Sequence, residues 1–216
     1  MYKIDNRVYI IFIIFFISLS VNSYATDYTV SSPLELYNVR DDLAGSYTQT
    51  ANINLIGTDP TKVPVWSNTE NYLVDDYVKN VAYTYTYICL QANTGMALTN
   101  SYYWQQLWAT WETTSEGWDP IGNWDESGDE ETEFTGTYDG GGFTISNLTI
   151  NTPTLNMVGL FGCMIGTSKT NIAQLKNIKL IDVTIKGRSG VGSLLGKIDD
   201  NQYVVIDRLL SSRWQR

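Results

Sequence analysis

The stretch 134–162 reads FTGTYDGGGFTISNLTINTPTLNMVGLFG, and parts of it return later in the chain. The segment ISNL (145–148) recurs as LKNI (175–178), an offset of 30 in the numbering. VGLFG (158–162) recurs as VGSLLG (191–196), an offset of 33 with one residue inserted, and a third copy begins at IDRL (206–209), at an offset of 31 from LKNI. Repeats of this period are typical of solenoid proteins, in which each repeat buries its apolar face by stacking on the next.

The apolar residues of these repeats alternate with polar ones. Leu148 and Ile150 flank Thr149, and the later copies keep this alternation without helical spacing. Alternation of this kind predicts short β-strands. Four glycines fit sharp corners between them, namely Gly159, Gly162, Gly192 and Gly196. The sequence therefore predicts an all-β chain folded as a short parallel β-helix, or β-solenoid, with Leu148, Ile178 and Leu209 stacked in one inward-facing column.

The repeats also resemble a known family. The spacing YDGxGFxIxNL (138–148) followed by VGLFG (158–162) is similar to the Glug-motif repeats of large bacterial exported and surface proteins, and the similarity extends upstream to WDPIG (118–122). For residues 112–216 the resemblance implies an extracellular scaffold of the kind found in adhesins. It transfers no catalytic residues.

Residues 1–25 are interpreted as a secretory signal peptide. Lys3 and Arg7 form its positive end, residues 8–19 form its apolar core, and Ala25 precedes the cleavage point. The alternative is a retained anchor, but the apolar run is shorter than the ~20 residues that a spanning helix needs. We expect an exported protein at the cell surface or outside the cell, with the periplasm as another destination, and without a membrane span after cleavage.

The amino-acid composition excludes several classes of partner and catalytic site. The formal net charge of −9 argues against nucleic acid and anionic membranes as partners. The chain has no histidine, which excludes Ser-His-Asp and Cys-His catalysis and His-ligated metal sites. We expect no cofactor and no metal. Export would permit a disulfide, but Cys89 and Cys163 fall in parts interpreted as different modules, so their state stays open.

Residues 26–63 are interpreted as an N-terminal cap and a first coil. Ser32, Pro33 and Glu35 have the spacing of a helix N-terminus with a capping box. One apolar stripe follows at helical spacing, made of Leu36, Val39 and Leu43. This short one-sided helix is expected to plug the open end of the core. Apolar and polar residues then alternate over 47–55, which is expected to form the first coil of the solenoid.

Residues 64–111 interrupt the repeats with a segment dense in tyrosine and tryptophan, which is interpreted as a separate insert. The insert resembles the small chitin-binding module of bacterial chitinases and phage tail proteins at, in order, Trp66, Tyr72, DYV (76–78), YIC (87–89) and YWQQL (103–107). The resemblance implies a small three-stranded β module whose exposed aromatic rings stack on sugars. Two features depart from that family: CLQA (89–92) replaces a usual tryptophan pair, and Asp75 replaces a usual turn glycine.

The aromatic residues of the insert divide into two groups. The core of this small unit is expected to consist of Trp66, Tyr87 and Trp104 and to be separate from the core of the solenoid. Tyr72, Tyr83 and Tyr103 are the candidates for carbohydrate contact, because sugar rings stack on flat aromatic faces that remain exposed. Polysaccharide or a surface glycan is therefore the expected partner.

Acidic residues elsewhere are assigned structural roles. The stretch DESGDEETE (125–133) lacks the spacing of an EF-hand and is interpreted as a solvated loop. Asp139 precedes Gly140 and is interpreted as a turn residue. The chain ends after VVIDRLL (204–210) without a polar cap, so the last coil is expected to be truncated or covered by a partner.

The prediction that follows is a non-enzymatic, exported, adhesin-like surface protein whose β-solenoid carries a carbohydrate-binding module. Two alternatives stay open. One is a polysaccharide-active enzyme on a β-helix, for which the later repeats offer only the clustered acids Asp182, Asp199, Asp200 and Asp207. The other is a truncated fragment of a larger adhesin.

Overall fold

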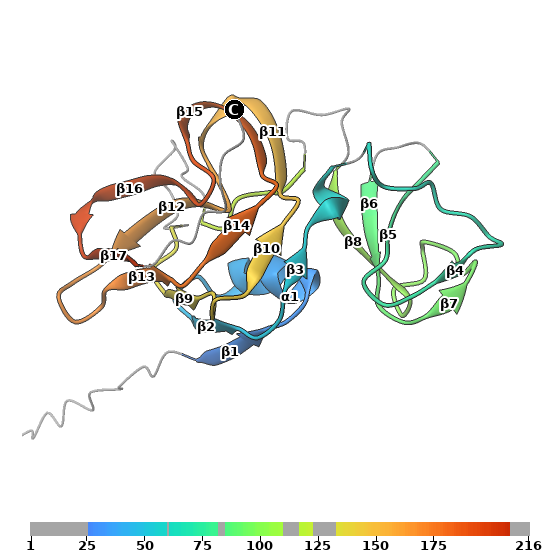
Figure 1. Cartoon of the computed structure of the whole chain (residues 1–216), viewed down its shortest axis with the longest axis horizontal. Coiled ribbons are helices and arrows are strands. Elements are labelled where there is room, and N and C mark those ends of the chain that lie inside the picture. The colour runs from blue at the N-terminus through green and yellow to red at the C-terminus, as the bar shows by residue number, and fades with distance from the viewer. Residues whose placement is uncertain (1–25, 60, 82–84, 110–116, 123–132, 208–216) are drawn as a thin grey trace, which may run out of the picture.

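The computed structural model of the protein describes residues 26–59, 61–81, 85–109, 117–122 and 133–207 (Figure 1). These residues form mainly β-strands with one short α-helix, so the all-β prediction is confirmed. The expected signal peptide, most of the acidic loop and the segment 208–216 lie outside the described part. No helix within that part is long and apolar enough to cross a membrane.

Parallel strands make up the larger half of the molecule (Figure 1). One five-stranded sheet contains, in spatial order, β1 (Asp27–Val30), β2 (Ser46–Gln49), β9 (Thr137–Asp139), β13 (Ala173–Lys176) and β17 (Val204–Asp207). A second sheet contains β14 (Lys179–Ile181), β10 (Thr144–Ser146) and β3 (Ile53–Asn54). Two further pairs are β11 (Thr149–Val158) with β15 (Thr184–Val191), and β12 (Phe161–Gly166) with β16 (Leu195–Gln202).

Two successive passes of the chain visit these sheets in the same order. The first pass runs through β9, β10, β11 and β12, and the second runs through β13, β14, β15 and β16, each strand pairing in parallel with its predecessor. The sheets remain open. Their facing side chains form one large core that contains Phe134, Tyr138, Ile145, Leu148, Ile150, Phe161 and Leu175, all fully buried.

The register corrects the predicted offset of 30 between ISNL and LKNI. Ile145 pairs with Leu180, an offset of 35, and Tyr138 pairs with Leu175, an offset of 37. Thr149 pairs with Thr184, so Leu148 does not align with Ile178, and Leu209 lies outside the described residues. The predicted column is therefore wrong for its first two members. The offsets of 33 for Val158 with Val191 and 31 for Leu175 with Ile206 are confirmed.

The wrong offset of 30 between ISNL and LKNI has a structural cause. Each pass turns at more than one corner through a residue with left-handed backbone, and Asn147, Asn177 and Asp182 have φ of 59°, 54° and 53°. Such a conformation suits asparagine and aspartate among the non-glycine residues. The same short motif therefore appears at neighbouring corners, and matching ISNL to LKNI assigns it to the wrong corner of the next pass.

Close backbone contact explains the repeat glycines better than corner geometry does. A Cβ on Gly159 would lie 2.7 Å from the carbonyl oxygen of Gly192, and one on Gly196 would lie 2.3 Å from the carbonyl carbon of Met157. Gly162 and Gly196 lie inside β12 and β16 rather than at corners, which corrects that expectation. A Cβ on Gly162 would lie 2.4 Å from the Gly122 carbonyl oxygen, so both glycines allow another backbone segment to approach closely.

The helix predicted after Ser32 begins as expected, but the α-helix ends at Tyr37 and a 3-10 helix follows to Asp41, so Leu43 lies beyond both. Ser32 caps α1 (Pro33–Tyr37), and its Oγ accepts from the Glu35 N–H at 3.2 Å. The Glu35 carboxylate accepts from the Ser31 N–H at 2.7 Å, one residue before the expected partner. The 3-10 helix η1 (Asn38–Asp41) continues the chain, and Leu36 and Val39 are fully buried in the large core.

The insert forms two antiparallel sheets. One pairs β4 (Asn71–Tyr72) with β7 (Asn93–Thr94), and the other is ordered β5 (Tyr77–Lys79), β6 (Tyr85–Cys89) and β8 (Trp104–Ala109). The chain leaves the parallel sheets, which together are called the coils below, after the 3-10 helix η2 (Ile56–Thr58). The points where it leaves and returns both lie beside Thr149, the first residue of β11. The Thr149 N–H donates to Thr58 Oγ1 at 2.8 Å, and the Trp118 N–H donates to the Thr149 carbonyl at 3.0 Å.

The insert does not keep its core separate from the coils. Tyr72, Val78, Cys89 and Trp104 form a cluster of their own. From the opposite face of the sheet, Tyr77, Ile88 and Leu107 join the large core. The expectation of two separate cores is therefore wrong for this face, because alternate residues of β6 point to opposite sides. Cys89 and Cys163 are both buried and free.

Candidate functional site

The three predicted contact residues have different surroundings. Tyr72 is only 7% exposed, and its ring packs edge-on against Trp104 with centroids 5.0 Å apart. Its hydroxyl accepts from the Ser67 N–H at 2.7 Å and donates to the Ser67 carbonyl at 3.1 Å. Tyr72 therefore does not offer the expected exposed stacking face, because β4 folds it over the indole of Trp104. Tyr83 lies outside the described residues.

Tyr103 is half-buried and belongs to an exposed aromatic pair. Its ring meets that of Tyr102 at 85° with centroids 4.9 Å apart, and Tyr102 is 66% exposed. The turn before β8 positions the pair, since Asn100 Oδ1 accepts from the Tyr102 N–H at 3.1 Å. Sequence reasoning identifies Tyr103 alone. The Asn100-Ser101 turn before two tyrosines was the available signal for Tyr102.

A second aromatic pair lies on β6. Tyr85 and Tyr87 share the face of the sheet opposite Ile88, and therefore face away from the coils. Tyr85 is 40% exposed, and the Tyr87 hydroxyl donates to Gln106 Oε1 at 3.4 Å on the neighbouring strand. Partial burial and the nearby Tyr85 raise the pKa of Tyr87. The period of two along 83, 85 and 87 was the signal that would have found Tyr85.

The predicted core of the insert is confirmed at Trp104 and only in part elsewhere. Trp104 is 2% exposed, whereas Trp66 and Tyr87 are half-buried against the insert cluster. The indole N–H groups of Trp66 and Trp104 both donate to the Met96 carbonyl, at 3.1 and 2.9 Å. One backbone oxygen thus satisfies both indole donors.

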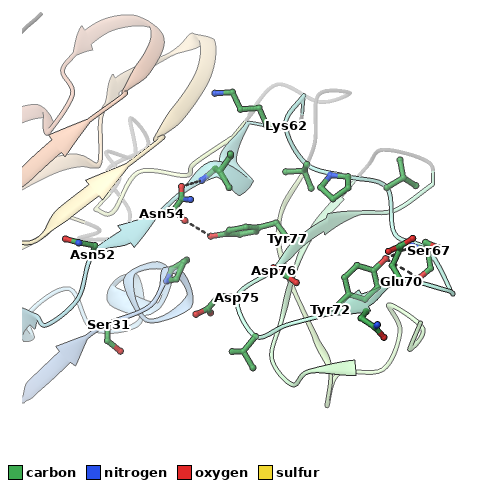
Figure 2. Close-up of a pocket in the computed structure, with 17 residues that line it drawn as sticks. Ser31, Asn52, Asn54, Lys62, Ser67, Glu70, Tyr72, Asp75, Asp76 and Tyr77 are labelled. Atoms are coloured by element: carbon green, nitrogen blue, oxygen red, sulfur yellow. Dashed lines mark hydrogen bonds between the residues drawn. The ribbon is translucent and has the colours of Figure 1, made fainter. Parts of the chain in front are cut away.

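A cleft of about 920 Å³ separates the insert from the first coils (Figure 2). This volume lies in the range of small-molecule and cofactor sites. Figure 2 shows the polar side chains of the coil wall, which are Ser31, Asn52 and Asn54. It also shows those of the insert wall, which are Lys62, Ser67, Glu70, Tyr72, Asp75, Asp76 and Tyr77.

The coil wall presents amide nitrogens. Asn52 Oδ1 accepts from the Thr144 N–H at 2.9 Å. Asn54 Oδ1 accepts from the Ile56 N–H at 3.1 Å and from the Asn147 side chain at 2.8 Å. Both carbonyl oxygens are thereby engaged with the protein. Within the described part of the chain, the Nδ2 groups of Asn52 and Asn54 have no hydrogen-bond acceptor.

The insert wall presents carboxylates. Asp75 occupies the left-handed region with φ of 70°, and its N–H donates to the Cys89 carbonyl at 2.9 Å. Partial burial and the nearby charges of Glu35 and Asp76 raise the pKa of Asp75. Its carboxylate has no hydrogen bond or ion pair to any residue that the structure describes. Asp76 closes the same turn, since its Oδ2 accepts from the Leu73 N–H at 2.7 Å.

Tyr77 extends from the insert wall towards Asn54 on the coil wall and so connects the two (Figure 2). Its hydroxyl donates to the Asn54 carbonyl at 3.4 Å, and burial raises its pKa. Its ring lies directly on Gly57, where an added Cβ would come within 2.1 Å of Tyr77 Cδ1. This close contact sets how the insert sits on the coils, so the cleft is preformed.

Other acidic groups do not assemble a metal site within the described ranges. Asp139 is a turn residue as predicted, and its Oδ1 accepts from the Gly141 N–H and from Asn177 Nδ2, each at 2.9 Å. A second hollow of about 770 Å³ is lined by Arg40, Asp42, Glu133 and Asp199, among others. Among the described residues, no group of three Cys, Asp or Glu side chains is placed to hold a metal ion.

Comparison with known proteins gives one partial similarity. No known family matches the chain, and no solved structure matches it significantly. An 88-residue segment is 35% identical to Halomucin of Haloquadratum walsbyi. This segment is 41% of the present chain and 1% of Halomucin, so the chain spans a very small part of that protein.

Proposed function

We propose that this is an exported, non-enzymatic surface protein in which a short β-solenoid displays an inserted module that binds carbohydrate. The observation that carries the proposal is the presence of two partly exposed tyrosine pairs on the insert, Tyr85 with Tyr87 on β6 and Tyr102 with Tyr103 at the start of β8. The amide of Gln106 lies beside Tyr87, and such a combination suits a sugar ring, whose C–H groups stack on aromatic faces while its hydroxyls bond to amides.

The scaffold part of the proposal is supported by the parallel pairing of successive passes. Strands from successive passes of the chain pair with one another in the same sheet, and all of these strand pairs are parallel. Side-chain ladders accompany the stacking, since Asn147 Nδ2 donates to Asn54 Oδ1 and Asn177 Nδ2 donates to Asp139 Oδ1. A stack of this kind is a rigid platform for a displayed module.

Surface attachment is supported by the interpretation of residues 1–25 as an export signal and by the partial similarity to Halomucin. Binding without catalysis is supported by the absence of histidine from the sequence and by the turn role of Asp139. Polysaccharide or a surface glycan is the proposed partner.

Pulldown on insoluble polysaccharides and titration with soluble oligosaccharides test the proposal. Tyr85→Ala and Tyr102→Ala should each weaken binding by about 1 kcal/mol or more, because each removes an exposed ring. Phe143→Ala is the matched control, since Phe143 is 37% exposed but lies on the coils rather than on the insert. Failure of the parent protein to bind any glycan would overturn the proposal.

A further inference from the structure

The cleft between the insert and the coils offers complementary hydrogen-bonding groups on its two walls. The coil wall presents the Nδ2 donors of Asn52 and Asn54, whose oxygens are fixed by the protein. The insert wall presents acceptors, the carboxylates of Glu70 and Asp75. A ligand that spans the cleft must therefore accept hydrogen bonds from the coil wall and donate hydrogen bonds to the insert wall.

The charged residues of the cleft restrict the chemical class of the ligand further. Glu70, Asp75 and Asp76 line the cleft, and the one cation among its described lining residues is Lys62, whose ammonium lies 3.3 Å from Asp59. Phosphate, sulfate and uronic acid groups would meet repulsion there. Neutral hydroxyls satisfy both walls, because each hydroxyl is at once a donor and an acceptor.

The cleft also has apolar surface and a fixed width. Pro33, Ile56, Val63, Pro64, Val65 and Val74 line it between the polar groups. The Tyr77 ring on Gly57 holds the walls in place, so little ordering of the walls is needed when a ligand binds. This mixture of apolar patches and fixed polar groups is what the two faces of a pyranose ring require.

We propose that the cleft is a second carbohydrate subsite, which takes a neutral sugar chain between Asn52 and Asn54 on the coils and Asp75 on the insert. The inference rests on the proposed function and deepens it, because the coils then take part in binding rather than only displaying the module. Asp75 is a specificity-determining residue in this subsite. Its carboxylate accepts sugar hydroxyls and repels acidic sugars.

The test titrates the full-length protein with short neutral oligomers of glucose and of N-acetylglucosamine, and with oligogalacturonate of equal length. Asp75→Gly removes the acceptor while suiting the left-handed backbone of Asp75. Asp182→Gly is the matched control, because Asp182 is also exposed and left-handed, with φ of 53°, but does not line the cleft. Asn52→Asp keeps the oxygen that accepts from Thr144 and replaces the donor with an acceptor.

We expect Asp75→Gly and Asn52→Asp each to weaken binding of the neutral oligomer about tenfold or more, with melting temperatures close to that of the parent. Asp182→Gly should leave the affinity within about twofold. Oligogalacturonate should bind more weakly than the neutral oligomers.

Three results would overturn the inference. If the parent binds a neutral oligomer and the two cleft variants bind it equally well, the subsite is absent while the proposed function stands. Equal or tighter binding of oligogalacturonate would refute the role of Asp75 in charge selection. If the parent binds no oligosaccharide at all, the proposed function fails, and the subsite fails with it.

Discussion

Trp104 shows how a single residue organises the insert. Its ring contacts Tyr72 edge-on, and its indole N–H shares the Met96 carbonyl with Trp66. Small domains bury little surface, so one large side chain carries much of the packing energy. Tyr72 and Trp66 are consequently structural, and contact with a ligand falls chiefly to more exposed rings, such as Tyr85 and Tyr102.

Trp104→Ala should lower the free energy of unfolding by about 3–5 kcal/mol, because it empties a core site and leaves Met96 with one donor fewer. Urea denaturation followed by circular dichroism measures the change. Gln105→Ala is the control, since Gln105 is exposed on the adjacent position of β8. Equal stability of the two variants would show that Trp104 is not part of the core.

Asp139 should make stability depend on pH in the acid range. Partial burial raises its pKa, but hydrogen bonds from Asn177 and the Gly141 N–H, and the charge of Lys176, together lower it. A carboxyl group whose pKa is lower in the folded state stabilises the fold above its unfolded pKa of about 3.9. That contribution is lost as the pH falls through the folded pKa. Asp139→Asn should therefore flatten the acid limb of a stability–pH profile, and an unchanged limb would contradict the assignment.

The two thiols should be unreactive in the native protein. Both are buried, and burial raises the pKa of Cys163 to about 11, so little thiolate is present near neutral pH. Ellman's reagent should label neither cysteine before denaturation and both after it. If the denatured protein still fails to react until a reductant is added, the two cysteines form a disulfide and are not free.

At the scale of elements, the junction between η2 and β5 joins the insert to the coils. Gly57 lies under the Tyr77 ring, and Tyr77 belongs to the large core together with Ile88 and Leu107. A short 3-10 helix with a glycine at its centre lets the ring approach the backbone. This close contact is therefore one of the interactions that fix the orientation of the insert.

Gly57→Ala should displace the Tyr77 ring and lower the melting temperature, because the new methyl group would overlap Tyr77 Cδ1. Limited proteolysis should then cut between the insert and the coils sooner than in the parent. Gly142→Asn provides a comparison, since a Cβ there meets no atom within 4 Å and asparagine tolerates its φ of 77°. Parent-like behaviour of Gly57→Ala would refute a tight junction.

At the scale of the whole molecule, one core extends from the coils into the insert. Tyr77, Ile88 and Leu107 bury their side chains against coil residues, while Trp104 and its neighbours form a second cluster beyond them. The insert is therefore a docked unit rather than a freely tethered one. Its docking creates the cleft, which neither part forms by itself.

A variant that lacks residues 64–111 should retain β-structure but melt at a lower temperature than the parent. The deletion takes three buried side chains from the large core and exposes the coil surface that they cover. Circular dichroism measures both quantities. An unchanged melting temperature would mean that the insert contributes nothing to the coils, as the sequence-based expectation of separate cores implies.

Local patterns in the sequence determined much of the fold. Alternation of apolar and polar residues predicted short strands, Ser32 and Pro33 predicted the start of α1, and Asp139 before glycine predicted a turn. Each of these depends on neighbours along the chain. Tertiary structure alone decided the register of Ile145 with Leu180 and the burial of Tyr72. It also decided the cleft, because strand pairing, core packing and docking arise from contacts between residues far apart in the sequence, and local periodicity carries no information on which distant segments meet.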